Sequence, residues 1–135
     1  AQIQLKESAD ITASGNVVNV FFKGKNYTGY SKIEFIQNTP AEFGITPAGH
    51  KSNSRLYKEN LLVLAYSGRL QMSNQINVED YVAGVIEAES GSGSELEYYK
   101  VQAIISRTYA LNNMRRHTGE GFNVCDLLDK SSKFP

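Results

Sequence analysis

The sequence predicts an α+β fold, in which a β-rich N-terminal half is packed with two consecutive helices. Short runs of β-branched and aromatic residues, separated by turn residues, continue to about residue 75. From Ile76 onward, apolar residues recur at helical spacing, and the Ser-Gly-Ser-Gly segment 90–93 separates two such stretches. With 135 residues, 41% of them hydrophobic and 21% charged, the chain has the length and composition of a globular protein with one core.

The strands of the first half are predicted from local pattern. Polar and apolar residues alternate over 32–36, as they do in a half-buried strand. Residues 38–53 hold two prolines and two glycines and are predicted to form a loop. Ser67-Gly68, between two apolar runs, predicts a hairpin. The predicted strands are 16–22, a run from Tyr27, 32–36, 61–66 and 70–72.

Two helices are predicted in the second half. The first should begin after Asn77, whose side chain can cap the first free amides, with Asp80 close to the same amides. It should end in the glycine-containing break, because glycine disfavours a helix interior. Ser94, with Glu97 three residues later, has the pattern of a capping box and predicts a second helix to about Arg116.

Charge and cysteine content exclude several classes of partner and site. Fourteen basic and fourteen acidic residues give a net charge of zero, so no nucleic-acid partner is predicted. A single cysteine, Cys125, excludes an intrachain disulfide, and His50 and His117 lack metal-ligand spacing, so neither a metal nor a cofactor is predicted. The sequence has no apolar run of about 20 residues, the length needed to span a bilayer. A start at Ala1 without methionine fits a processed or trimmed chain.

Glu89 is the candidate catalytic residue of the first helix. It continues the helical series of Val85 and Ile86, so it should project from the buried face in the last turn. Partial burial and the negative end of the helix dipole would both favour its protonated form, which a general acid needs at neutral pH. The alternative is that the helix frays at Ala88 and that Glu89 points to water.

The second helix has an unusual cross-section. A solvent-facing side normally carries Glu and Lys, but here the side opposite the apolar face carries small and uncharged hydrogen-bonding residues. Such a face suits close packing against another element or contact with a sugar, and a helix buried on both sides would show the same pattern. The apolar face consists of Val101, Ile104, Ile105, Thr108 and Leu111, and the opposite face of Tyr99, Gln102, Ala103, Ser106, Tyr109, Ala110 and Asn113.

Lys100 and Arg107 lie two turns apart on one flank of the second helix. They could hold an anionic group of a ligand, or a carboxylate such as that of Glu89. The alternative is that both are surface cations whose apolar stems lie along the helix.

Residues 77–89 read NVEDYVAGVIEAE, and residues 99–111 read YKVQAIISRTYAL. Together they resemble the signature of the SpoIID/LytB family, approximately L-x-x-Y-V-x-G-V-V-x-x-E-M followed by L-K-A-Q-A-x-A-A-R-T-Y. Upstream, residues 55–57 and 70–77 fit the family's lead-in, and downstream, residues 123–126 are similar to its V-C-D element. The resemblance therefore covers roughly residues 55–126. It divides the chain into a β-rich N-terminal segment, 1–54, and the N-terminal part of a SpoIID/LytB-like domain, 55–135.

The resemblance implies an activity and a set of site residues. In the family, the glutamate that matches Glu89 is the catalytic acid of a lytic transglycosylase, which cleaves peptidoglycan glycan strands already stripped of stem peptides. Glycan strands and other cell-wall hydrolases are the implied partners, and the extracytoplasmic cell envelope, periplasmic or secreted, is the implied location. The implied substrate-binding residues are Lys100, Gln102, Ser106, Arg107 and Tyr109.

The sequence departs from the family pattern in three places. Ser90-Gly91 stand where the family usually has Met-Pro, which makes the loop after Glu89 more flexible. The zinc site that some members build lacks its second cysteine and its histidine here, so the resemblance does not imply a metal. The family's later H-G-x-G-M-S-Q-x-G-A element is absent from these 135 residues. The expected cleft is therefore incomplete, or it is completed by another segment.

Two alternatives to an enzyme follow from these departures. One is a noncatalytic envelope module that binds glycan or stimulates an amidase. The other is a scaffold in an envelope complex, whose apparent site is vestigial.

Overall fold

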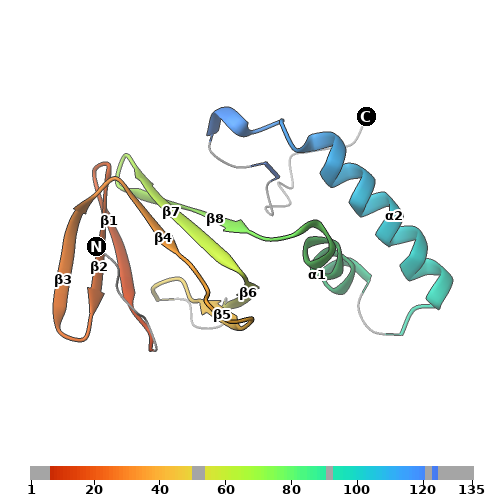
Figure 1. Ribbon diagram of the computed structural model, residues 1–135, viewed down its shortest axis with the longest axis horizontal. Coiled ribbons are helices and arrows are strands. Elements are labelled where there is room, and N and C mark those ends of the chain that lie inside the picture. Colours follow the sequence, from red (N-terminus) through yellow and green to blue (C-terminus); the bar gives the residue numbers. More distant parts are fainter. Residues whose placement is uncertain (1–6, 50–53, 91–92, 121–122, 125–135) are drawn as a thin grey trace. The chain divides into compact units, whose positions relative to one another are not determined.

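The structure is a computed structural model that describes residues 7–49, 54–90, 93–120 and 123–124. Antiparallel sheets precede two helices, so the predicted α+β class is confirmed (Figure 1). The contacts within the chain divide it into two compact units, Ala1–Gln75 and Ile76–Pro135. The strands are β1 (Asp10–Ser14), β2 (Val17–Phe22), β3 (Lys25–Tyr30), β4 (Lys32–Phe35), β5 (Glu42–Ile45), β6 (Arg55–Lys58), β7 (Asn60–Tyr66) and β8 (Arg69–Gln75); the helices are α1 (Val78–Ser90), α2 (Leu96–Asn113) and the short 3-10 helix η2 (Thr118–Glu120).

The first unit consists of antiparallel sheets. One sheet has the order β1-β2-β3, a second has the order β4-β7-β8, and β5 pairs with β6. The predicted hairpin is confirmed: β7 and β8 are joined by Ser67 and Gly68, with φ of 49° and 78°. Lys23 and Gly24 join β2 and β3 in the same way, with φ of 50° and 75°. Two residues with positive φ give a turn whose twist matches that of the paired strands.

The core of the first unit lies between its two three-stranded sheets. Val18 of β2 and Val63 of β7 are completely buried. Leu61 and Ala65 point to the same side as Val63, because alternate residues of a strand share one face. Together with Val18, these three residues form the buried cluster of the first unit.

The hairpin turns of the two sheets are hydrogen-bonded to each other. The amide of Gly68 donates to the carbonyl oxygen of Gly15 over 2.7 Å. The amide of Ser67 donates to the side-chain oxygen of Asn16 over 3.0 Å. These bonds satisfy donors of the β7–β8 turn and tie it to the β1–β2 turn, 51 residues earlier.

The predicted loop 38–53 is wrong in part, because β5 lies within it. β5 pairs with β6, and the rings of Phe43 and Tyr57 are stacked with centroids 5.9 Å apart. β5 is stabilised by hydrogen bonds to β6, a strand that comes later in the chain. Because of this pairing, a short strand forms although prolines and glycines lie nearby. Residues 50–53 lie outside the described part of the chain.

The second unit contains the two predicted helices. The side-chain oxygen of Asn77 accepts hydrogen bonds from the amides of Glu79 and Asp80, each over 3.0 Å, which confirms the predicted cap. The predicted capping box of α2 is wrong: its N-cap is Glu95, which makes no side-chain capping bond. Ser94 instead donates from its hydroxyl to the carbonyl of Ser90 over 3.5 Å.

The boundary between the compact units, after Gln75, lies at the start of the helical region. The boundary predicted between residues 54 and 55 is a different one, since it marks where the family's domain begins. It stays a prediction. In the described part of the chain, α1 and α2 are the helices longer than one turn. Neither is both long enough and apolar enough to cross a membrane.

Candidate functional site

The two helices contact each other, and the side chains that they bury are small or medium-sized. The buried residues of α1 and α2 are Val82, Ser106 and Ala110, with 3%, 8% and 5% of their surfaces exposed. Small residues let two helix backbones approach closely, and a deep contact then excludes water. Of the alternatives for the small uncharged face of α2, the structure therefore shows packing against another element.

The apolar face of α2 is exposed, so the alternative of a helix buried on both sides is wrong. Ile104 has 62% of its surface exposed, and Val101, Ile105 and Leu111 are each more than half exposed. The buried residues of α2, Ser106 and Ala110, belong to the face with small residues, and α2 contacts α1.

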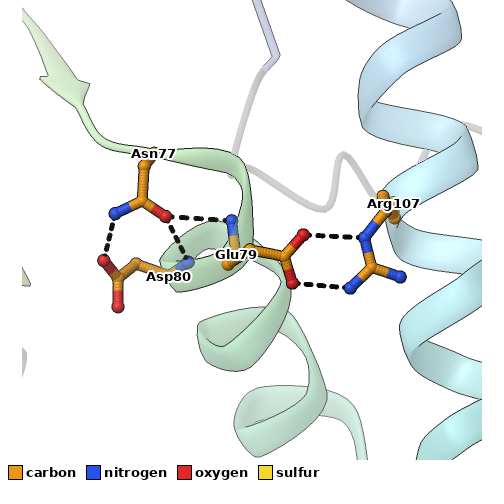
Figure 2. A network of polar contacts seen from close by, with 4 residues as sticks. All are labelled: Asn77, Glu79, Asp80 and Arg107. Atoms are coloured by element: carbon orange, nitrogen blue, oxygen red, sulfur yellow. Dashed lines mark hydrogen bonds and ion pairs between the residues drawn. The ribbon is translucent and has the colours of Figure 1, made fainter.

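Arg107 forms a two-point ion pair with Glu79 (Figure 2). Its Nε donates to Oε1 of Glu79 over 2.8 Å, and Nη2 donates to Oε2 over 2.6 Å. The hydrogen bond with Arg107 is the main cause that lowers the pKa of the Glu79 carboxyl; desolvation opposes it, and the charge of Arg107 adds to the lowering. The pair links the first turn of α1 to the second half of α2.

Lys100 is also paired with a carboxylate of the second unit. Its ammonium donates to Oε1 of Glu97, one turn earlier in α2, over 2.7 Å. The two cations predicted to hold an anionic group therefore have Glu97 and Glu79 as partners. The interpretation in which Lys100 or Arg107 holds the carboxylate of Glu89 is wrong.

Glu89 lies in the last turn of α1, as predicted, but its side chain is exposed. The expected burial of this carboxyl is therefore wrong, although the helix does not fray before Glu89 and continues to Ser90. Arg107 bonds to Glu79 at the other end of α1, and the ten residues from there to Glu89 span about 15 Å along a helix. The structure therefore places Arg107 and Glu89 at opposite ends of α1.

The helices run in opposite senses, so the first half of α2 lies at the end of α1 that carries Glu89. Arg107 meets the start of α1, whereas Tyr99 meets the chain that follows α1. Lys100 and Gln102 belong to this first half, and Gln102 is half-buried. Tyr109 lies at the Arg107 end with 46% of its surface exposed, and Asn113 donates to its carbonyl oxygen over 2.8 Å.

Tyr99 is a residue of this region that the sequence analysis did not assign to the site. Its hydroxyl accepts hydrogen bonds from the amides of Gly93 and Ser94, over 3.2 Å and 3.0 Å. A tyrosine at a position where the signature has leucine was the available signal, because a buried or half-buried phenol needs a polar partner.

Metal ligands do not gather in the described part of the chain. No group of three or more His, Cys, Asp or Glu residues is placed there to hold a metal ion. Cys125 and His50, which the sequence analysis considered, lie outside the described residues.

Comparison with known proteins places these helices in a family. The family model described as "SpoIID: Stage II sporulation protein" matches residues 66–134, about half of the chain, including α1 and α2. The chain is also similar to an uncharacterized protein of Brachyspira hyodysenteriae, with 31% identity over 75 residues. That match covers 56% of this chain and 20% of the relative's length.

No solved structure matches the chain. The family match includes Glu89 and all five predicted substrate-binding residues. Proteins of this family have roles connected with the cell wall and are generally extracytoplasmic. By the family match over residues 66–134, this chain belongs to the SpoIID family.

Proposed function

We propose that this protein cleaves peptidoglycan glycan strands, preferably peptide-free ones, as an extracytoplasmic lytic transglycosylase. Glu89 is the general acid and base of the proposed reaction. The observation that carries the proposal is that the match to the SpoIID family over residues 66–134 includes Glu89, the residue that the resemblance of the sequence aligns with the family's catalytic glutamate. Its exposed carboxyl at the end of α1 supports the proposal further, because a polymer can reach it there.

One carboxyl can serve both proton transfers of this reaction. The protonated carboxyl of Glu89 gives its proton to the glycosidic oxygen as the bond from that oxygen to the anomeric carbon breaks. A hydroxyl of the same sugar then attacks the anomeric carbon, and the carboxylate takes the proton of that hydroxyl. The product ends in an anhydro sugar and no water is consumed, so the second carboxyl of an ordinary glycosidase is not needed.

The candidate substrate residues fall into two groups under this proposal. Lys100 and Gln102 lie in the half of α2 nearer to Glu89 and would contact the sugars next to the cleaved bond. Tyr109 and Arg107 lie toward the start of α1 and would contact more distant sugars. Ser106 is buried between these groups, so its proposed role is to support the face rather than to reach into solvent.

Mass spectrometry of the products tests the proposal. The chain is incubated with peptide-free glycan strands and, in parallel, with intact peptidoglycan. Anhydro-terminated fragments are expected from wild type and should be absent with Glu89→Gln. Glu87→Gln is the matched control, because Glu87 is also an exposed glutamate of the last turns of α1 and should leave the products unchanged.

A second candidate function is a noncatalytic envelope module that binds glycan or stimulates an amidase. The observation that favours it is the pairing of Lys100 with Glu97 and of Arg107 with Glu79, which neutralises the two cations predicted for the substrate. Glycan binding that persists in Glu89→Gln, without anhydro products from wild type, would select this function. Faster peptide release by an added amidase would then identify the stimulating form.

A further inference from the structure

The hydroxyl of Tyr99 lies against the chain that joins α1 to α2. It accepts hydrogen bonds from two successive amides, those of Gly93 and Ser94, over 3.2 Å and 3.0 Å. A hydroxyl oxygen has two lone pairs and can accept both. Since both amides precede the first turn of α2, the hydroxyl holds the end of the linker on the helix that follows it.

A second contact continues from this linker to α1. Ser94, whose amide is held by Tyr99, donates from its own hydroxyl to the carbonyl oxygen of Ser90 over 3.5 Å. Ser90 is the last residue of α1 and directly follows Glu89. Tyr99 is thus connected to the turn that carries Glu89 by two steps, both between described residues.

The sequence after Glu89 explains why such a contact is needed. Gly93 has φ of 108°, a conformation open to glycine and rarely adopted by other residues. Glycine admits many backbone conformations, so a hydrogen bond to the amide of Gly93 restricts the chain at this residue. The family signature has Met-Pro where this chain has Ser90-Gly91, and leucine where it has Tyr99. A proline restricts the backbone covalently, and a hydroxyl that binds two amides can restrict it from outside.

We infer that Tyr99 is a positioning residue for Glu89. Its hydroxyl fixes Gly93 and Ser94, and through Ser94 it fixes the last turn of α1. The inference rests on the proposed function, because positioning matters only if Glu89 acts on a substrate. It is specific to this chain, since leucine at this position has no hydroxyl.

Tyr99→Phe is the test variant, because it removes one oxygen and keeps the ring. The ring also makes an edge contact with Tyr98, with centroids 6.2 Å apart, and this contact remains in the variant. Tyr98→Phe is the matched control, since it removes a hydroxyl from the neighbouring, exposed ring. Both variants are made in the full chain, and amide hydrogen exchange of Glu89, Gly93 and Ser94 is measured by NMR beside kcat and KM on peptide-free glycan strands.

In Tyr99→Phe, the amides of Gly93 and Ser94 should exchange about fivefold faster, the factor that corresponds to one typical net hydrogen bond of about 1 kcal/mol. The Glu89 amide should also exchange faster, because the end of α1 is loosened. The value of kcat should fall by about the same factor while KM stays within about twofold, since the lost contact affects orientation and not binding. Tyr98→Phe should change none of these quantities.

Two results would overturn the inference. Unchanged exchange of Gly93 and Ser94 in Tyr99→Phe would show that the hydroxyl does not hold the linker. Faster exchange there, with an unchanged kcat, would show that the linker does not position Glu89. A wild type that cleaves nothing refutes the proposed activity and with it the positioning of Glu89 for catalysis. Exchange at Gly93, Ser94 and Glu89 in Tyr99→Phe still decides separately whether the hydroxyl holds the end of α1.

Discussion

The guanidinium of Arg107 and the carboxylate of Glu79 form two parallel hydrogen bonds, 2.8 Å and 2.6 Å long, between α2 and the first turn of α1 (Figure 2). This two-point geometry fixes the planes of both groups, which a lysine cannot do. Arg107 was expected to serve a ligand or Glu89. The structure pairs it with Glu79 in the first turn of α1.

The Glu79–Arg107 pair should make the stability of the hairpin depend on pH. The pKa of Glu79 is lowered in the folded protein, so the folded state favours the ionised carboxyl. The stabilisation is fully present above the ordinary glutamate pKa and is lost as the pH falls through the lowered value. The raised pKa of Arg107 acts only at strongly alkaline pH.

Urea unfolding followed by helical circular dichroism, from neutral to acidic pH, measures this dependence. Glu79→Gln should lower the urea concentration at the midpoint of unfolding at neutral pH. The difference between the midpoints of the variant and wild type should shrink as the pH falls. Glu87→Gln, an exposed change on the same helix, controls for the loss of a charge. A difference that stays constant down to strongly acidic pH would contradict the assignment.

Changes in side-chain size should affect stability strongly on one face of α2 and weakly on the other. Ala110→Val adds volume to the face packed on α1 and should reduce the free energy of unfolding by about 1–3 kcal/mol. Ile104→Ala removes a larger side chain from the exposed face and should change it by less than about 0.5 kcal/mol. Urea unfolding of both variants gives the two values. A larger loss for Ile104→Ala than for Ala110→Val would show that the aliphatic face is the packed one.

Features that depend on local chemistry were predictable from the sequence. The cap at Asn77 and the end of α1 near Ser90 follow from residue types within one turn. The hairpin at Ser67-Gly68 follows from two turn residues between apolar runs. The family signature was recognisable because it also lies in two short segments.

Features that depend on distant partners were not predictable in the same way. β5 exists because β6 pairs with it, and Arg107 finds its partner 28 residues earlier. The sequence left open which face of α2 is buried, because hydrophobicity does not say which face allows the closer approach of α1. The burial of Glu89 was predicted from the periodicity of α1, but the last turn of that helix extends beyond the packed part.

The bond between the two hairpin turns of the first unit should contribute measurably to its stability. The amide of Ser67 donates to the side-chain oxygen of Asn16, so Asn16→Ala removes the acceptor. The expected loss in the free energy of unfolding is about 0.5–1.5 kcal/mol, the net value of a typical hydrogen bond. Asn16→Asp keeps an oxygen at the same position and should retain most of the stability.

Exchange of the Ser67 amide identifies the cause of this loss. It should be faster in Asn16→Ala, while the Gly68 amide, which donates to the carbonyl of Gly15, should change less. A global loss of protection at Val63 and Leu61 would mean that the whole sheet had been destabilised. Protection that is lost only at Ser67 would show a local bond between turns, and unchanged protection there would refute the bond itself.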